Sequence, residues 1–102
     1  MITTIVRFRL PQHLSTDQAR ELFQGSAPAF QKVPGLLRKH FLLSDDGSHA
    51  GGSYLWADRD SAESFINNTL ANMIRQKYHS EPEIEYFSSP VLVDNLNGKI
   101  IS

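Results

Sequence analysis

Apolar and polar residues alternate over positions 2–10 in the manner of a β-strand with two different faces. One face carries Ile2, Thr4, Val6, Phe8 and Leu10, and the other carries Thr3, Ile5, Arg7 and Arg9. The first face is expected to pack under helices. The second face mixes apolar and charged side chains, so it is expected to need a cover other than bulk water. Pro11 ends the strand.

Apolar residues then recur at helical spacing. Ser15-Thr16-Asp17-Gln18 has the form of a capping box, and apolar residues follow at 19, 22, 23, 27 and 30. Pro28 would remove a backbone donor from a continuous helix and clash with its preceding turn. We therefore expect a break near Gly25-Ser26, with Ser26 capping a short second segment whose first turn accepts the proline.

The middle of the chain indicates a strand, a hairpin turn, a second strand and a helix. The predicted strands are 36–43 and 51–56, and the Asp- and Gly-containing segment 44–48 joins them. Gly51-Gly52 is typical of a bulge or a close backbone approach. Asp60-Ser61-Ala62-Glu63 resembles a capping box, and a 3-4 apolar repeat predicts a helix to Tyr78 with an irregularity near Asn67-Asn68.

A fourth strand is predicted over 83–88 and is interrupted by Ser89-Pro90, which favours an edge position or a bulge. Val91-Leu92-Val93, a turn over 94–98 and a short apolar tail complete the chain. The order β-α-β-β-α-β predicts a ferredoxin-like α+β protomer with an antiparallel sheet. No linker is visible, so residues 1–102 are expected to form one domain.

Charge and composition exclude several functions. Ten Lys and Arg against eleven Asp and Glu give a net charge of −1. The chain therefore lacks the positive electrostatic field that attracts nucleic acid or an anionic membrane surface. The chain has no cysteine, so disulfides, thiolate nucleophiles and cysteine-based metal sites are excluded. Neither a signal peptide nor a membrane span is apparent, and a cytoplasmic protein is expected.

Three phrases carry a family resemblance: Val33 to Lys39, Gly51 to Trp56, and Val91 to Asn95. Together they resemble the YdhR-like monooxygenases, within the dimeric α/β-barrel superfamily that includes the antibiotic-biosynthesis monooxygenases. The resemblance extends from the first strand through Asn95. It implies a homodimer in which two sheets pack face to face, which would cover the face of Thr3, Ile5, Arg7 and Arg9.

The resemblance also implies a chemistry. Related oxygenases act on phenolic substrates without metal or flavin, because a substrate enolate or phenolate donates an electron to oxygen. Such a reaction needs a base, or a polar group that stabilises an anion, beside an apolar cavity. No cofactor is therefore expected, and the expected ligand is a small aromatic molecule.

His40 is the candidate catalytic residue, because imidazole transfers protons near neutral pH. Strict alternation places it with Leu36, Arg38 and Leu42, opposite Lys39 and Phe41. The alternative is a histidine that is packed in the dimer interface or hydrogen-bonded to a neighbour.

Lys39, Tyr54, Trp56 and Tyr86 are the candidate ligand-binding residues. Lys39 either serves an anionic ligand or extends its ammonium to water. Tyr54 and Trp56 share a strand face and offer stacking surface, but aromatic strand residues also serve as core. Cross-strand register is not fixed by the sequence, so these residues and His40 could fall on opposite sheet faces.

The remaining polar residues have simpler interpretations. Arg7 and Arg9 could bind a carboxylate or phenolate, but pairing with Glu83 or Glu85, across the sheet or across the dimer interface, is favoured. His13, His49 and His79 share no element or ligand spacing, and Asp45-Asp46 is turn chemistry, so no metal site is expected. Met73 is expected in the core.

Three functions remain open. The first is a cofactor-independent monooxygenase acting on a small phenolic or quinol-type compound. The second is a non-catalytic small-molecule binding or interaction protein on the same dimeric scaffold. The third is a cyclase or isomerase that uses the cavity for proton transfer alone.

Overall fold

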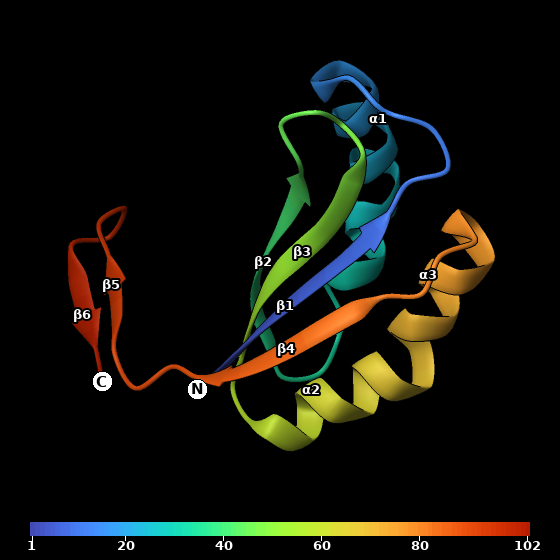
Figure 1. Cartoon of the computed structure of the whole chain (residues 1–102). Helices are drawn as coiled ribbons and strands as arrows, with labels where there is room; N and C mark the ends of the chain where they lie inside the picture. Colours follow the sequence, from blue (N-terminus) through green and yellow to red (C-terminus); the bar gives the residue numbers. More distant parts are fainter.

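Four antiparallel strands form the main sheet in a computed structural model that describes residues 1–102. β1 (Ile2–Arg9) lies between β3 (His49–Trp56) and β4 (Glu83–Ser88), and β2 (Leu36–Leu43) flanks β3 (Figure 1). The strand order β2-β3-β1-β4 and the chain order β-α-β-β-α-β confirm the predicted ferredoxin-like α+β protomer.

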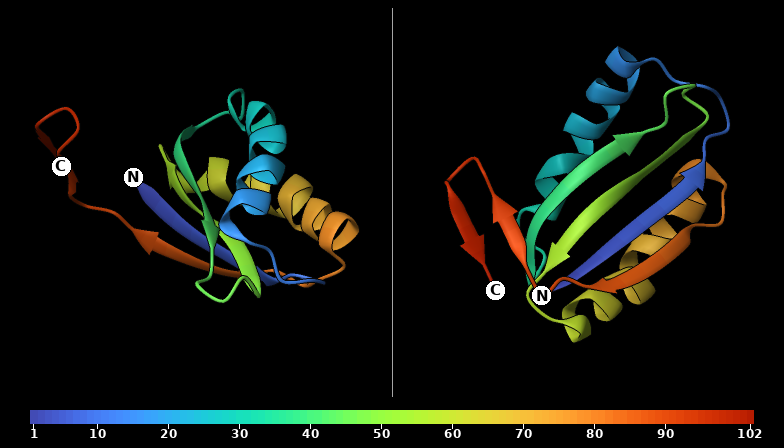
Figure 2. Two further views of the ribbon diagram at one scale, coloured as in Figure 1. Left: turned by 90° about the horizontal axis from the view of Figure 1, so that it is seen from above. Right: turned by 60° about the vertical axis from the view of Figure 1, so that its left-hand side comes forward.

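Two helical segments cover one face of this sheet (Figure 2). The first consists of α1 (Thr16–Ser26) and a 3-10 turn (Ala27–Phe30). The second runs without interruption through α2 (Arg59–Phe65), a π-helical turn (Ile66–Leu70) and α3 (Ala71–Tyr78). The π-helical turn confirms the irregularity predicted near Asn67-Asn68.

The hydrophobic core lies between the sheet and these helices. Val6 of β1, Tyr54 and Trp56 of β3 and Ile66 of the π-helical turn are all at most 2% exposed. The face of β1 that begins with Ile2 therefore packs under the helices, as the alternation of apolar and polar residues predicted.

The first helical segment begins as predicted and breaks where Pro28 requires it. The Ser15 hydroxyl accepts the Gln18 backbone N–H, and the Gln18 side chain accepts the Ser15 N–H, which completes the capping box. The predicted cap at Ser26 is wrong: its backbone is helical and its side chain makes no capping bond. The chain tightens into a 3-10 turn instead, and Pro28 lies in the first positions of that turn.

The predicted capping box at the start of the second segment is also wrong. Asp58, two residues earlier, is the N-cap, and its carboxylate accepts the Ser61 backbone N–H at 2.8 Å. Asp58 has extended backbone angles, while Asp60 already lies in the first helical turn, where a carboxylate is favourable. At the other end His79, in the left-handed conformation, closes α3.

A β-bulge in β2 changes the predicted grouping of its side chains. Leu36 pairs with Trp56, but Arg38, not Leu37, pairs with Leu55. The extra residue puts Leu36 on the core face and Arg38 on the opposite face. Grouping Leu36 with Arg38 by strict alternation is therefore wrong, because the bulge inserts one residue between them.

Gly51 allows β3 and β1 to approach closely. A Cβ atom at this position would collide with the backbone carbonyl of Val6. This confirms the prediction of a close backbone approach at the glycine pair. The preceding turn has Gly47 at φ 74°, and the Asp46 carboxylate accepts hydrogen bonds from Ser44 and Ser48.

The C-terminal residues form a separate hairpin, where the sequence indicated only an apolar tail. β5 (Leu92–Asp94) pairs with β6 (Lys99–Ile101), and the hairpin stands apart from the main sheet and the helices (Figure 1). Its side chains are largely exposed, including Leu96 at 90% and Ile100 at 76%. Little of its apolar surface packs on its own protomer.

The sheet face opposite the helices is open. Leu42 and Phe87 are 39% and 47% exposed on this outer face, beside the half-buried Ile5 and Leu55. No helix in the structure has the length and apolar character needed to cross a membrane.

Candidate functional site

A cavity of about 50 Å³ lies between the sheet and the two helical segments. Its walls come from the three strands β1, β2 and β3, from α1 with its 3-10 turn, and from the π-helical turn with α3. Aromatic and aliphatic side chains make up most of the lining: Phe8, Phe23, Phe30, Phe41, Tyr54, Leu70, Met73, Ile74 and Tyr78. Gly51, Ser26, Lys39 and Lys77 complete it.

Lys39 and Tyr54 form a polar pair in this apolar lining. They are paired residues of β2 and β3, and the Lys39 Nζ donates a hydrogen bond to the Tyr54 hydroxyl at 2.5 Å. The same nitrogen lies 3.9–4.2 Å from the ring centroids of Phe30, Phe41 and Tyr54. The ammonium is therefore enclosed by aromatic rings. The alternative in which Lys39 extends its ammonium to water is wrong.

The surroundings of Lys39 change its protonation. None of the four ion pairs in the structure includes this residue, and burial lowers the pKa of Lys39 to about 7. The three ring faces attract the cation and oppose this shift in part. Burial, followed by the nearby Tyr78, raises the pKa of the Tyr54 hydroxyl, which stays protonated. The pair thus offers an amine that changes charge near neutral pH beside a hydroxyl that keeps its proton.

Stacked rings hold this pair in place. Tyr54 stacks on Trp56 with centroids 5.9 Å apart, and the Trp56 indole N–H donates to the Thr4 hydroxyl at 3.0 Å. On the other side Phe41 stacks on Phe23 at 5.0 Å and meets the edge of Phe30 at 5.6 Å. The cavity wall around Lys39 is therefore fixed by packing.

A hydrogen bond joins α1 and α3 at the cavity lining. The Lys77 Nζ on α3 donates to the Ser26 hydroxyl at the end of α1 at 3.0 Å. Met73, expected in the core, is 37% exposed and lines the cavity beside Lys77. No carboxylate lines the cavity, so the ionisable groups that face Lys39 there are Tyr54, Tyr78 and Lys77.

The structure does not bring His40 to the cavity. His40 pairs with Ser53 on the outer sheet face and is exposed, whereas its neighbour Lys39 pairs with Tyr54 on the helix-facing side. The two candidates on β2 therefore lie on opposite faces of the sheet.

Two of the proposed ligand-binding residues lie away from the lining. Trp56 is fully buried and does not line the cavity. Its ring stacks on that of Tyr54, which does. Tyr86 on β4 lies under the Arg59 guanidinium, whose central carbon is 4.7 Å from the ring centroid. Lys39 and Tyr54 are the two candidates that the cavity brings together.

Sequence reasoning missed most of the aromatic lining. Phe41 could have been found, because it shares strand parity with Lys39. Phe23 and Phe30 belong to the apolar repeat of the first predicted helix. Only the 3-10 turn and the packing of α1 on β2 bring Phe30 over the ammonium and Phe23 against Phe41. These contacts depend on tertiary structure.

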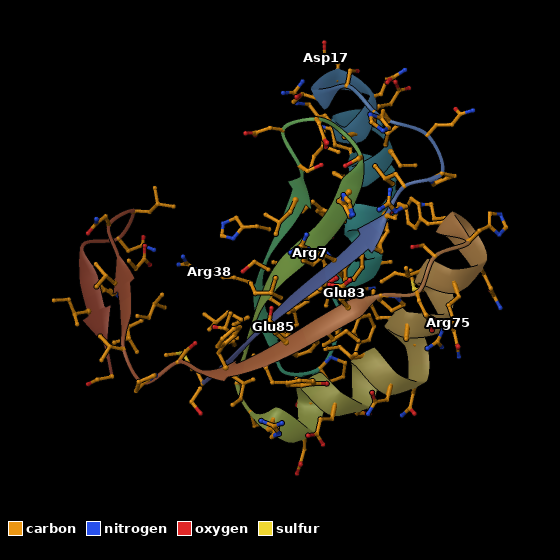
Figure 3. All side chains as sticks on the ribbon, in the orientation of Figure 1. Arg7, Asp17, Arg38, Arg75, Glu83 and Glu85 are labelled. Carbon is orange, nitrogen blue, oxygen red and sulfur yellow. The ribbon has the colours of Figure 1, made fainter.

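The charged residues on the outer face remain separate from the cavity. Arg7 lies opposite Glu83 in the β1–β4 register, and Ile5 opposite Glu85 (Figure 3). Within the protomer no ion pair joins Arg7 or Arg9 to either acid, and pairing across a dimer interface stays a prediction. No group of three His, Asp or Glu side chains is arranged to hold a metal ion.

The fold and the cavity define a ferredoxin-like α+β protein with an aromatic pocket beneath its helices. The sequence model of the family described as "Putative mono-oxygenase ydhR" matches residues 5–88. The chain belongs to this family, which confirms the resemblance seen in the sequence. No curated protein matches the chain by sequence.

Solved structures share this fold at low sequence identity. SnoaB of Streptomyces nogalater, described as a cofactor-independent oxygenase, is 19% identical with a TM-score of 0.62, covering 86% of this chain and 91% of its own. The ActVA-Orf6 monooxygenase of Streptomyces coelicolor, solved with nanaomycin D, is 17% identical with a TM-score of 0.63, covering 86% of each chain. A Deinococcus radiodurans protein described as a "putative antibiotic biosynthesis monooxygenase" is 14% identical with a TM-score of 0.64, covering 92% of this chain and 97% of its own.

Proposed function

We propose that the protein is a cofactor-independent monooxygenase of small phenolic or quinol-type compounds. The observation that carries this proposal is the Lys39–Tyr54 pair inside an aromatic cavity. Membership of a mono-oxygenase family supports it, as does a fold shared with a cofactor-independent oxygenase.

Lys39 and Tyr54 have complementary roles in this proposal. In its neutral form the Lys39 amine accepts the proton of the substrate hydroxyl. The Tyr54 oxygen already accepts a hydrogen bond from Lys39, so its own O–H is free to donate to the phenolate oxygen. The surrounding rings keep the substrate ring stacked and the anion away from water.

The phenolate then supplies all the electrons for the reaction with dioxygen. Its charge is delocalised to a ring carbon, which forms a bond to oxygen. One oxygen atom remains on the ring as the second carbonyl of a quinone, and the other leaves as water with the ring hydrogen and the hydroxyl proton. A hydroxyarene and O₂ thus give a quinone and water, and the proton taken up by Lys39 returns in the water.

The size of the cavity limits the substrate. Sites for drug-sized ligands usually measure 300 Å³ or more, roughly six times the present volume. Met73 and Lys77 are exposed and unbranched, so their side chains can move aside for a ring. We therefore favour substrates of one or two rings.

Oxygen consumption tests the proposal. The protein is supplied with a panel of hydroquinones and naphthols, and the rate is corrected for oxidation without protein. We expect uptake of ¹⁸O₂ with one labelled atom in the product, and a loss of about a hundredfold in Lys39→Met. Lys32→Met, an exposed lysine outside the cavity, is the matched control. No protein-dependent uptake across the panel would reject the proposal.

A non-catalytic binding protein is the second candidate, and the small, well-packed cavity favours it. Quenching of Trp56 fluorescence reports on this alternative, because Trp56 stacks on the cavity residue Tyr54. Saturable quenching by the same compounds without oxygen uptake would support binding alone.

We further propose that the protein works as a homodimer through its outer sheet face. Phe87 and Leu42 are exposed there, and the C-terminal hairpin carries further exposed apolar side chains. A stable interface needs more than about 1,000 Å² of buried area, which a four-stranded face can supply. In such a dimer His40 would be an interface residue.

A further inference from the structure

Lys39 has the surroundings of a nucleophilic amine, which is a second chemistry beyond proton transfer. Its nitrogen lines a cavity with no carboxylate, and its one hydrogen-bond partner is the Tyr54 hydroxyl. An amine reacts with carbonyl groups only when it is neutral, and an apolar site disfavours the ammonium form. Lysines that form Schiff bases are activated in this way.

Gly52 leaves room beside this nitrogen. A Cβ atom on Gly52 would lie 2.8 Å from the Lys39 Nζ and 2.8 Å from a carbon of the Tyr54 ring. Any larger residue at this position would push against both members of the pair. The absence of a side chain therefore keeps the amine in its position beside the hydroxyl.

We propose that the Lys39 amine captures small aromatic aldehydes and ketones in the cavity as a reversible imine. The reaction needs no oxygen, so it stands apart from the oxygenase proposal although it uses the same cavity. The aromatic lining selects ring-bearing carbonyl compounds, and Tyr54 supplies the acid that the condensation requires.

The steps balance without an oxidant or a reductant. The nitrogen lone pair forms a bond to the carbonyl carbon, and the carbonyl oxygen takes the proton of the Tyr54 hydroxyl. The nitrogen then returns a proton to the Tyr54 oxygen, which leaves a carbinolamine. Loss of the hydroxyl group with the second nitrogen proton releases one water molecule and forms the carbon–nitrogen double bond.

The other lysines lack these surroundings. Lys32 and Lys77 are exposed, and Lys77 donates to the Ser26 hydroxyl. Lys99 lies exposed on the C-terminal hairpin. Lys39 is thus the one lysine enclosed by aromatic rings and paired with a phenol.

Reductive trapping tests this inference. The full chain is incubated with benzaldehyde and cyanoborohydride under argon at pH 7, and the intact mass and peptide map are followed with time. We expect one benzyl group per chain, at Lys39, formed at least about tenfold faster than at Lys32. The trapping rate should rise with pH through about 7, where Lys39 loses its proton.

Variants separate the chemistry from the fold. Lys39→Arg should abolish the rapid adduct, and Lys32→Arg should leave it unchanged. Tyr54→Phe keeps the ring but removes the acid, so trapping at Lys39 should slow about tenfold or more. Circular dichroism checks that each variant is folded. Equal labelling of Lys39 and Lys32, or a rapid adduct in folded Lys39→Arg, would overturn the proposal. The argon atmosphere keeps this result independent of whether oxygen is consumed.

Discussion

Arg38 and Asp94 join two parts of the molecule that are otherwise separate. The Arg38 side chain extends from the outer face of β2 toward the C-terminal hairpin (Figure 3). Its guanidinium donates to the Asp94 carboxylate of β5 at 2.7 Å. The Asp94 side chain is only 4% exposed, and it also accepts hydrogen bonds from the backbone of Leu96 and from Asn97. One carboxylate thus shapes the hairpin turn and connects the hairpin to the Arg38 side chain of β2.

Replacing Asp94 by Asn should release the hairpin. The variant loses the charge that binds Arg38, so residues 92–101 should be cut by protease much faster than in the unchanged protein. Limited proteolysis with mass spectrometry measures this rate. Asp17→Asn removes an exposed ion pair with Arg20 and is the matched control. Equal protection of the hairpin in both variants would contradict the role given to Asp94.

The same attachment should weaken in acid. Hydrogen bonds from Asn97, and then the contact with Arg38, lower the pKa of Asp94 below its ordinary value. A depressed carboxyl pKa adds stability above the ordinary value near 4, and that stability is lost as pH falls through the lowered pKa. We expect hairpin protection to be constant from pH 5 to 7 and to decrease below about pH 4. Hydrogen exchange of the hairpin amides follows this change.

Removal of residues 97–102 should weaken a homodimer. This deletion removes β6 with its exposed Ile100 and Ile101, and it breaks the turn that Asp94 holds. Light scattering over a range of micromolar concentrations gives the dissociation constant. A monomer in the unchanged protein would reject the dimer, and an unchanged constant in the deletion would exclude the hairpin from the interface.

Lys39→Met should change how stability depends on pH. Because burial lowers the native pKa of Lys39 to about 7, the unfolded chain binds more protons than the native protein between about pH 7 and 10. Stability of the unchanged protein should therefore rise with pH in this window. Below pH 7 the native protein carries the full free-energy cost of burying the charged Lys39 ammonium. The gain from Lys39→Met should be largest at pH 6 and smaller at pH 9.

Urea unfolding at pH 6 and pH 9 measures the difference in the free energy of unfolding between Lys39→Met and the unchanged protein. Tyr54 and Tyr78 face Lys39 in the cavity, and burial raises the pKa of both hydroxyls above the ordinary value, outside this range. The neighbouring Lys77 is kept in both proteins. An equal difference at pH 6 and pH 9 would show that Lys39 is charged in the native state throughout.

His40→Ala should have little effect on turnover. His40 lies on the sheet face opposite the cavity, so its removal should change the oxygenase rate by less than about threefold, whereas loss of a general base costs a hundredfold or more. Tyr54→Phe is the informative comparison, since it removes only the hydroxyl that contacts Lys39. A hundredfold loss in His40→Ala, with the dimer intact, would restore the histidine as the base.

The sequence predicted the elements well because their signals are local. The Ser15 capping box, the break at Pro28 and the irregularity after Ile66 each follow from a few neighbouring residues. The prediction of a side-chain cap at Ser26 was wrong because the backbone continues into a 3-10 turn, which needs no such bond at that position. The local pattern at Pro28 therefore specified where the helix breaks, but not how the backbone groups at that break are satisfied.

The site was predicted less well because it depends on register and packing. Lys39 and Tyr54 were candidates, but their contact follows from the pairing of β2 with β3. The ring of Phe30 reaches Lys39 only after α1 and its 3-10 turn pack on β2. Nothing within a single segment indicates these contacts.

The bulge between Leu36 and Arg38 determines which basic side chain the cavity receives. Leu36 remains in the core, so the single inserted residue puts Lys39 on the helix-facing side and His40 on the other. A β2 strand that paired in strict alternation from Leu36, with Leu37 opposite Leu55 and no bulge, would exchange the two faces and offer the His40 imidazole to the cavity in place of the amine. A one-residue slip in the pairing of β2 with β3 would thereby change the acid–base chemistry of the cavity while the other helices and strands stayed in place.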